Sequence, residues 1–333
     1  MNTQNTLTDQ FGRNHDYLRI SLTERCNLRC FYCMPEEGIP HRDSTNFMST
    51  EEVLDIAGRF VQHGVKKIRL TGGEPLVRKD AEDVIRGLGK LPVELAITTN
   101  GILVDEFIDV LKESRVKKIN VSLDTLQAER FNKITRRDYF TRVRNNIDLL
   151  VANDFEVKLN AVLIKGVNDD ELKDFILFTE NNKIEYRFIE FMPFDGNKWN
   201  FSKCLSHKEI LESIHTIFPE TVVRLMDNPN DTSRHYKING FTGSFAIISS
   251  ITNPFCDSCN RIRLTADGKM KNCLFSGDET DLLSIYRSGA DIMPAVKESL
   301  FHKKQRRAGM ESHHDLEQQQ TLYPNRSMVM IGG

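Results

Sequence analysis

The sequence predicts an α/β fold: a partial, open parallel β/α barrel of about six units, followed by a C-terminal region of different character. Strand-like and helix-like segments alternate over about the first 200 residues, which is typical of a parallel sheet with helical crossovers. Six units are fewer than the eight of a closed barrel. After about residue 200 the alternation stops. We therefore expect a barrel core at residues 1–200 and a separate C-terminal region at 201–333.

The elements of the core are expected in regular order. Ser49 and Glu52 form a capping box that begins a helix, and Gly64 ends this helix after about residue 63. Further helices are expected at about 80–90, 105–114, 141–153 and 169–182. The strand candidates between them lie at 18–23, 66–71, 94–100, 117–124, 156–164 and 186–193.

Five consecutive strand candidates carry one polar and one apolar face, because residues i and i+2 of a strand share a face. Helices would cover the apolar faces. The polar faces would then line a lumen that is too charged to be a packed core, so we expect it to hold a ligand; an edge-exposed sheet is the alternative. The polar faces comprise Lys67, Arg69 and Thr71; Thr98 and Asn100; Asn120, Ser122 and Asp124; Lys158 and Asn160; and Glu190 with Met192.

The C-terminal region begins with a helical pattern at 206–218, and short strand candidates follow at 222–225, 234–238 and 244–251. We expect this region to cap the lumen. Its basic run from His302 to Arg307 is interpreted as a solvated helix face or loop.

Six of the seven cysteines fall into two groups of three. Iron–sulfur cubes are usually held by four thiolates, so three thiolates would leave one iron open to a ligand. An open coordination position is also what separates catalytic from structural zinc sites. We therefore expect each group to hold a cluster with an open iron. The first group is Cys26, Cys30 and Cys33, and the second is Cys256, Cys259 and Cys273.

Other uses of the cysteines are weaker. The polar N-terminal segment has no apolar stretch typical of a signal peptide or anchor, and no later segment is apolar over a membrane-spanning length. We therefore expect a cytoplasmic protein, in which disulfides are rare. Zinc is the serious alternative, because thiolates bind both zinc and iron–sulfur clusters. Structural zinc requires four ligands, which neither group supplies unless His41 or Cys204 completes a site.

The basic residues suggest a polyanionic ligand. A formal net charge of −2 argues against a nucleic-acid surface. Arg261 and Arg263 would point to one side of an extended segment, and Arg19, Arg69 and Lys158 lie on or near the lumen faces. Guanidinium groups suit bidentate recognition of phosphate, so this convergence predicts a ligand such as a nucleoside triphosphate. The sequence has no P-loop, which disfavours a hydrolysing NTPase.

Two glycine pairs are candidates for close contact with a ligand or a cleft. Gly72 and Gly73 follow a strand directly, where they would let the backbone turn sharply and a ligand approach closely. A simple tight turn is the alternative, but beside the first cysteine loop the segment is a candidate for binding a small amino-acid-like ligand. Gly332 and Gly333 end the chain; such an end is usually frayed, but it is also thin enough to enter a cleft.

These motifs resemble those of a known family. Residues 26–35 (CNLRCFYCMP) resemble the cluster loop of radical S-adenosylmethionine (SAM) enzymes. From about residue 11 to residue 333, the chain resembles the GTP 3′,8-cyclases of molybdenum cofactor biosynthesis. The further matching segments are 71–76 (TGGEPL), 187–192 (RFIEFM), 255–263 (FCDSCNRIR), 273–275 (CLF) and the Gly-Gly end.

The resemblance implies specific site residues. Cys26, Cys30 and Cys33 would hold a [4Fe–4S] cluster whose free iron chelates SAM. Cys256, Cys259 and Cys273 would hold a second [4Fe–4S] cluster whose open iron meets the guanine base. SAM would contact Tyr32, Gly73, Ser122 and Met192, and GTP would bind to Arg19, Arg69, Thr98, Lys158, Arg261, Ile262 and Arg263. The implied catalytic residues are Cys26, Cys30, Cys33, Arg261, Arg263, Gly332 and Gly333, with the tail reaching the active site.

The implied activity is that of a lyase that converts GTP to (8S)-3′,8-cyclo-7,8-dihydroguanosine 5′-triphosphate. A 5′-deoxyadenosyl radical would abstract the ribose 3′ hydrogen, and the C3′ radical would attack guanine C8. The implied partners are a downstream cyclic pyranopterin monophosphate synthase, an electron donor such as flavodoxin and a second copy in a homodimer, with no nucleic acid or membrane. The alternatives are another radical SAM enzyme with an auxiliary cluster, such as a peptide modifier, and a non-enzymatic zinc-binding module.

Overall fold

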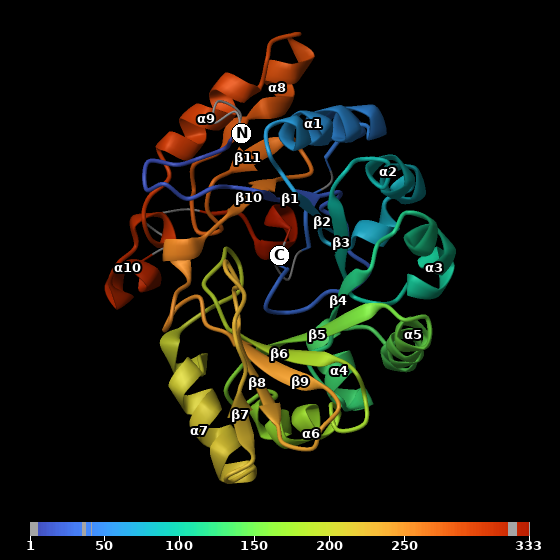
Figure 1. Cartoon of the computed structure of the whole chain (residues 1–333), viewed down its shortest axis with the longest axis vertical. Helices are drawn as coiled ribbons and strands as arrows, with labels where there is room; N and C mark the ends of the chain where they lie inside the picture. The colour runs from blue at the N-terminus through green and yellow to red at the C-terminus, as the bar shows by residue number, and fades with distance from the viewer. Residues whose placement is uncertain (1–5, 35–37, 41, 319–324, 333) are drawn as a thin grey trace.

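One curved sheet organises the part of the chain that the computed structural model describes, which is residues 6–34, 38–40, 42–318 and 325–332. The sheet has twelve strands in the order β12-β11-β10-β1-β2-β3-β4-β5-β6-β9-β8-β7 within these residues. Helices cover its outer side, and its concave inner side, whose surroundings are called the lumen below, faces the centre of the curve (Figure 1).

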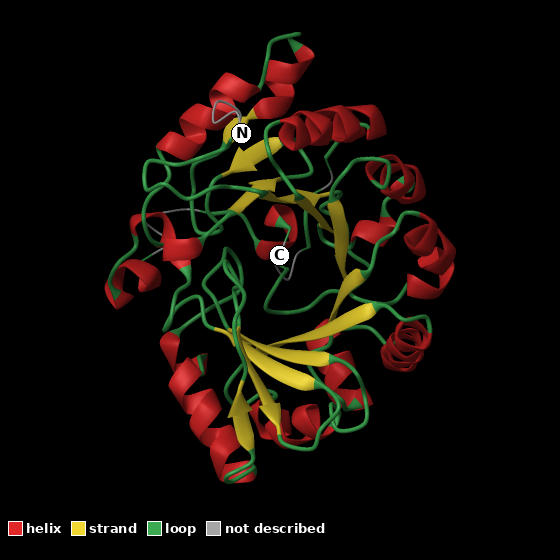
Figure 2. Cartoon of the chain, viewed as in Figure 1, coloured by secondary structure: helices red, strands yellow, loops and turns green. Residues whose placement is uncertain are grey.

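The centre of the sheet is parallel, as predicted. Strands β1 to β6 follow one another, β10 (Arg261–Leu264) pairs parallel with β1, and β9 (Ser244–Ile248) pairs parallel with β6. The two ends of the strand order do not pair with each other, so the barrel stays open (Figure 2). The six strands are β1 (Tyr17–Ser21), β2 (Lys67–Thr71), β3 (Glu94–Thr99), β4 (Lys118–Ser122), β5 (Glu156–Leu163) and β6 (Glu185–Glu190), all within two residues of the predicted bounds except at the end of β6.

The helices between these strands lie outside the sheet (Figure 1). The capping box of Ser49 and Glu52 is present, and Gly64 follows the helix with a φ of +96°. The helix expected at 169–182 is shorter, because backbone carbonyls at its end accept from the backbone of Thr242 and Gly243. The helices are α1 (Thr50–Gln62), α2 (Ala81–Leu88), α3 (Val104–Glu113), α4 (Ala128–Thr135), α5 (Phe140–Ala152) and α6 (Leu172–Leu177); α4 was not predicted.

The C-terminal region extends the same sheet. The helical pattern at 206–218 forms α7, and the predicted short strands form β7, β8 and β9. Its remaining elements are α7 (His207–Ile217), β7 (Val222–Arg224), β8 (Arg234–Ile238), β11 (Lys269–Lys271), β12 (Thr280–Asp281), α8 (Leu282–Arg287), α9 (Met293–Phe301), α10 (His313–Glu317) and α12 (Met328–Ile331). The domain boundary near residue 200 stays a prediction.

The main core lies between the sheet and its outer helices. Leu18, Ile68 and Ile97 are among its buried side chains, which the helices cover. A second apolar cluster, which includes Phe194, Phe275 and Ile331, packs the C-terminal tail against the region after β6. No helix among the described residues combines the length and apolarity that crossing a bilayer requires.

Strand register defines the inner face. Arg263, Arg19 and Arg69 lie side by side on three adjacent strands, and Asn120 lies beside Lys158. The predicted polar face of the sixth strand is wrong: Glu190 is in register with Leu163 of the apolar face, whereas Arg187 is in register with Asn160. Counting in steps of two from Glu190 therefore selected the outer face of this strand, and Arg187 is its inner residue.

Candidate functional site

The first cysteine group lies on the loop that follows β1. The loop is tied to the end of α4, because the backbone N–H of Arg29 donates to the carbonyl of Thr135 at 2.9 Å. Burial, with a contribution from Glu74, raises the pKa of Cys26 to about 11. Burial and the nearby Cys26 raise the pKa of Cys33 to about 12. The three sulfurs thus lie close enough to oppose one another's ionisation, and a metal that accepts thiolates would relieve this.

The glycines after β2 hold this loop in place. Gly72 has a φ of +150°, and a Cβ at this position would lie 2.6 Å from the Thr23 carbonyl oxygen. A Cβ on Gly73 would collide with the carbonyl oxygen of Arg25. The N–H of Gly73 donates to Thr23 at 2.8 Å. The glycines therefore allow two backbone segments to meet, and this accounts for their position without a ligand.

A cavity of about 210 Å³ opens beside the cysteine loop. All four residues predicted to contact SAM border it, together with Thr98. They reach it from different elements, because the carboxyl ends of parallel strands share one edge of the sheet. The predicted residues around this cavity are Cys26, Cys30, Cys33, Tyr32, Gly73, Thr98, Ser122 and Met192.

Asp124 and Asn100 are among the polar residues of this cavity that were not predicted as ligand contacts. The Tyr32 hydroxyl donates to Asp124 at 2.6 Å, and burial raises the pKa of Asp124 to about 6. The Asn100 side-chain amide donates to Asn27 at 2.6 Å and contacts the Cys26 sulfur at 3.8 Å. The alternation pattern placed both Asp124 and Asn100 on polar strand faces, and this pattern could have identified them as residues of the cavity.

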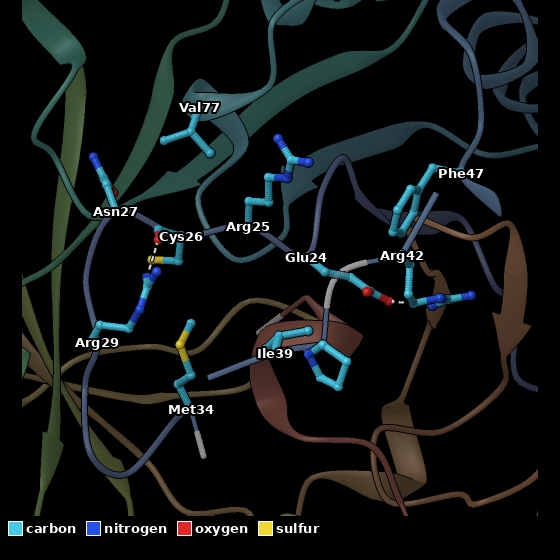
Figure 3. Close-up of a pocket in the computed structure, with 11 residues that line it drawn as sticks. Glu24, Arg25, Cys26, Asn27, Arg29, Met34, Ile39, Arg42, Phe47 and Val77 are labelled. Atoms are coloured by element: carbon cyan, nitrogen blue, oxygen red, sulfur yellow. Dashed lines mark hydrogen bonds and ion pairs between the residues drawn. The ribbon is translucent and has the colours of Figure 1, made fainter. Parts of the chain in front are cut away.

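A second cavity, of about 390 Å³, also borders Cys26 (Figure 3). Arg25, Arg29 and Met34 border it, and Arg29 donates to the carbonyls of Cys26 and of Leu28. Cys26 borders both cavities, so the cysteine loop forms a wall between them.

The second cysteine group lies at the opposite edge of the sheet. Cys256 and Cys259 precede β10, which runs parallel to β1, and Cys273 follows the antiparallel β11. Burial raises the pKa of Cys256, and the charges of Cys273 and Cys259 raise it further. Burial also raises the pKa of Cys259, but the nearby cations, Arg261 first, outweigh it and lower the pKa to about 6.

The interpretation of the basic run 302–307 as a solvated segment is wrong for two of its members. Lys303 is 2% exposed and Arg307 is 9% exposed. Arg307 donates to the Ile251 carbonyl at 2.8 Å, and Lys303 contacts the Cys259 sulfur at 3.5 Å. These two side chains are buried because they pack beside the second cysteine group, whereas the other residues of the run are exposed.

Zinc and an iron–sulfur cluster place different demands on the thiols. Among the described residues, no three His, Cys, Asp or Glu side chains gather closely enough to hold one metal ion. The ligands of zinc surround a single ion at about 2.0–2.3 Å, whereas the thiolates of a cluster bind different irons. Burial raises the pKa of Cys204, and the charges of Glu190 and Glu209, rather than either cysteine group, raise it further. His41 lies outside the described residues.

The predicted cations converge in the lumen between these two edges. Arg69 donates to the Tyr17 hydroxyl at 2.6 Å, and Arg19 hydrogen-bonds to the same tyrosine. Burial raises the pKa of Tyr17, but Arg69, Arg19 and Lys67 outweigh it and lower the pKa to about 7. Such a concentration of buried positive charge favours an anionic ligand.

Glu185 and Arg187, which were not predicted as site residues, lie beside these cations. Glu185 accepts from Lys158 at 2.8 Å and lies 2.7 Å from the Nδ1 of His235. Arg187 donates to Asn160 at 2.9 Å. Burial lowers the pKa of Arg187 to about 10. Arg187 belongs to the 187–192 motif. Counting alternate residues of the strand from Arg187 would therefore have identified the inner face of this strand.

The tail enters the lumen, and α12 is visible within the curve of the sheet (Figure 1). The Gly332 carbonyl accepts from Arg263 at 2.8 Å, and a Cβ on Gly332 would lie 2.5 Å from the Thr71 hydroxyl. Gly333 lies outside the described residues. Ile262 is in register with Leu18 and packs in the main core, so its side chain faces away from the lumen.

Comparisons with known proteins agree with this geometry. Residues 20–179 match the Radical SAM superfamily, and residues 184–309 match Molybdenum Cofactor Synthesis C. A protein of Arabidopsis thaliana named GTP 3′,8-cyclase, mitochondrial, is 45% identical over 98% of this chain and 83% of its own length. A GTP 3′,8-cyclase of Peptoclostridium acidaminophilum is 40% identical over 100% of both chains.

Other relatives are longer, and a solved structure shares the fold. Molybdenum cofactor biosynthesis protein 1 of Bos taurus is 44% identical over 98% of this chain, which spans 51% of that protein. The chain thus spans about half the length of the first curated relatives that it matches. The crystal structure of Streptococcus suis SuiB matches 96% of this chain and 78% of its own with a TM-score of 0.59 at 16% identity, which supports the fold alone.

Proposed function

The chain belongs to the radical SAM superfamily and, within it, to the GTP 3′,8-cyclase family of molybdenum cofactor biosynthesis, and from this we propose that it converts GTP to (8S)-3′,8-cyclo-7,8-dihydroguanosine 5′-triphosphate. One observation carries the proposal: a cation-lined lumen lies between two groups of three cysteines at opposite edges of one parallel sheet. Radical SAM membership implies SAM and one [4Fe–4S] cluster; the second cluster is part of the proposal.

We assign the binding of SAM to the cavity beside the first cysteine loop. Cys26, Cys30 and Cys33 would hold the first cluster, and the cavity-lining residues would position SAM. When bound, the cluster and SAM supply a 5′-deoxyadenosyl radical by reductive cleavage of SAM. The enclosing wall of the lumen would keep water from the reacting carbon. The SAM-binding residues in this assignment are Tyr32, Gly73, Ser122 and Met192.

We assign the triphosphate of GTP to the cationic part of the lumen. Arg19, Arg69 and Arg263 lie side by side, so their guanidinium groups would contact neighbouring phosphate oxygens. Lys158 would exchange Glu185 for phosphate. Cys256, Cys259 and Cys273 would hold the second cluster next to the guanine base, and Gly332 would border the reacting ribose.

The chemistry of the substrate follows from this placement. The ribose would lie between the SAM cavity and the base, so its 3′ hydrogen faces the adenosyl group. Abstraction of this hydrogen would leave a C3′ radical that attacks guanine C8, and one further electron from the external donor with a proton at N7 would complete the product. A flavodoxin-like donor, a downstream cyclic pyranopterin monophosphate synthase, a homodimer and a cytoplasmic location remain predictions.

The test is anaerobic turnover with GTP that carries deuterium at C3′. The reconstituted protein, SAM and dithionite should yield the cyclised nucleotide and 5′-deoxyadenosine that contains deuterium. Iron and sulfide analysis of the same sample distinguishes clusters from zinc. Deoxyadenosine without deuterium, or a protein that contains zinc and no sulfide, would overturn the proposal.

A further inference from the structure

Part of the basic run after α9 surrounds the second cysteine group. The guanidinium of Arg13 donates to the carbonyls of Cys256 and of Gln305, both at 2.8 Å, so it joins the cysteine loop to the run. Gln10 donates to the Lys303 carbonyl at 3.1 Å. The N-terminal segment and the basic run thus hold the cysteine loop from two sides, and Lys303 is enclosed between them.

The ammonium group of Lys303 points at the cysteine ligands. Its Nζ lies 3.5 Å from the Cys259 sulfur and 3.3 Å from the Arg261 carbonyl oxygen. The residue is 2% exposed. Within the described part of the chain, no carboxylate forms an ion pair with it, and the nearby Asp9 carboxylate is bonded to Arg13 at 2.6 Å.

A buried ammonium without a carboxylate needs another anion, because an uncompensated charge is costly in a protein interior. The Cys259 thiolate is the anion within reach, because its sulfur lies 3.5 Å from the ammonium group. Lys271 shows the contrast. It is also buried near Cys273, but Glu279 lies 3.4 Å from its ammonium group and compensates it.

We propose that Lys303 is the cation that compensates the second cysteine site and, when this site holds a cluster, stabilises its reduced state. The inference rests on the proposed second cluster. Thiolate ligation makes a cluster site negative, and uptake of one electron from an external donor adds to this charge without breaking a bond. A fixed cation next to a ligand sulfur therefore raises the reduction potential, since charge and hydrogen bonds to the sulfurs set that potential.

The experiment compares Lys303→Met with Lys304→Met in the full-length, reconstituted protein. Lys304 lies in the same run but is exposed, so its substitution removes an equal charge from solvent. The midpoint potentials of both clusters are measured by dithionite titration followed by electron paramagnetic resonance. We expect Lys303→Met to make reduction of the second cluster about tenfold less favourable, which is ~59 mV for one electron, and to leave the first cluster unchanged. Lys304→Met should change neither potential.

The outcomes separate the inference from the proposed function. Equal second-cluster potentials in the two variants would overturn the role of Lys303 and leave the function intact. A wild-type protein that assembles only one cluster would instead refute the proposed second site. Should Lys303→Met lose the second cluster, Lys303→Arg decides: a retained cluster of near-wild-type potential supports a role of the charge, and a lost one refutes it.

Discussion

Arg263 lies where the positive charge of the lumen is densest. Burial, with the neighbouring charges of Arg19 and Arg261, lowers the pKa of Arg263 to about 9. It donates to the neutral Gly332 carbonyl rather than to a carboxylate. Repulsion among these guanidinium groups persists until an anion enters, so this residue should matter more for a charged ligand than for the fold.

We predict that Arg263→Ala weakens GTP binding about ten- to a hundredfold and SAM binding much less. A charge-assisted hydrogen bond contributes roughly 1.5–3 kcal/mol. Titration of both ligands measures this, with Arg142→Ala, at a half-buried position on α5 outside the lumen, as the control. Equal losses for the two ligands would mean that the arginine is structural.

His235 lies among carboxylates on the side of the lumen next to β6. Burial lowers its pKa, but Asp231 and Glu185 outweigh this and raise the pKa from 6.5 to about 9. A group whose folded-state pKa is raised contributes stability below its unfolded value and loses it as the pH rises through the folded value. The imidazolium therefore stabilises the fold at pH 6, and this contribution disappears between pH 6.5 and about 9.

We predict that His235→Gln lowers the free energy of unfolding by ~1–3 kcal/mol at pH 6 and by much less at pH 10. Urea unfolding at the two pH values measures the difference. His215→Gln, on the exposed side of α7, is the control and should show no such dependence. A loss of stability that is the same at both pH values would refute the charged state of His235.

At the scale of elements, close contact between the turn after β2 and the cysteine loop determines the path of this loop. Gly73 and Glu74 donate backbone hydrogen bonds to Thr23 and Arg25, both at 2.8 Å. The turn thus sets the path of the loop between β1 and Cys26. A side chain at Gly73 would separate two backbones that have no room to move apart locally.

We predict that Gly73→Ala costs ~1–3 kcal/mol of stability and removes the first cluster, because overpacking displaces the cysteine loop. Gly58→Ala is the matched control: it lies in α1 with open space around its Cβ, so it should be neutral or stabilising. Thermal unfolding and iron content measure both effects. A stable Gly73→Ala protein with full iron would refute this role of the turn.

At the scale of the whole molecule, the two cysteine groups lie at opposite ends of the central parallel strands. Among the described residues, the hydrogen bonds seen for one group involve different partners from those seen for the other. They should therefore assemble independently.

We predict that Cys273→Ala retains the first cluster and uncoupled SAM cleavage but loses GTP cyclisation, whereas Cys30→Ala loses SAM cleavage. Release of 5′-deoxyadenosine, cyclised product and iron content are measured on each soluble variant. Intact cyclisation in Cys273→Ala would contradict a substrate-binding role of the second group. Loss of all iron in either variant would contradict independence.

Strand periodicity and caps were enough to predict the open barrel. The box at Ser49 gave the start of α1, whereas α4 was missed because its N-cap residue, Gln127, makes no side-chain capping bond. The site was predictable where spacing carries the chemistry, as for the cysteines. It was not predictable where distant segments meet: Lys303 looks solvated by composition and is buried by the N-terminal segment and the cysteine loop.

The position of β1 also orders events in time. β1 lies between β2, which follows it closely in sequence, and β10, which follows it much later in the chain. Arg19 and Arg263 can therefore become neighbours only after a ribosome has translated the message through β10. Pairings so distant in sequence form slowly. A nascent chain that ends before residue 261 therefore lacks part of the proposed phosphate site, and its first strand has one unpaired edge.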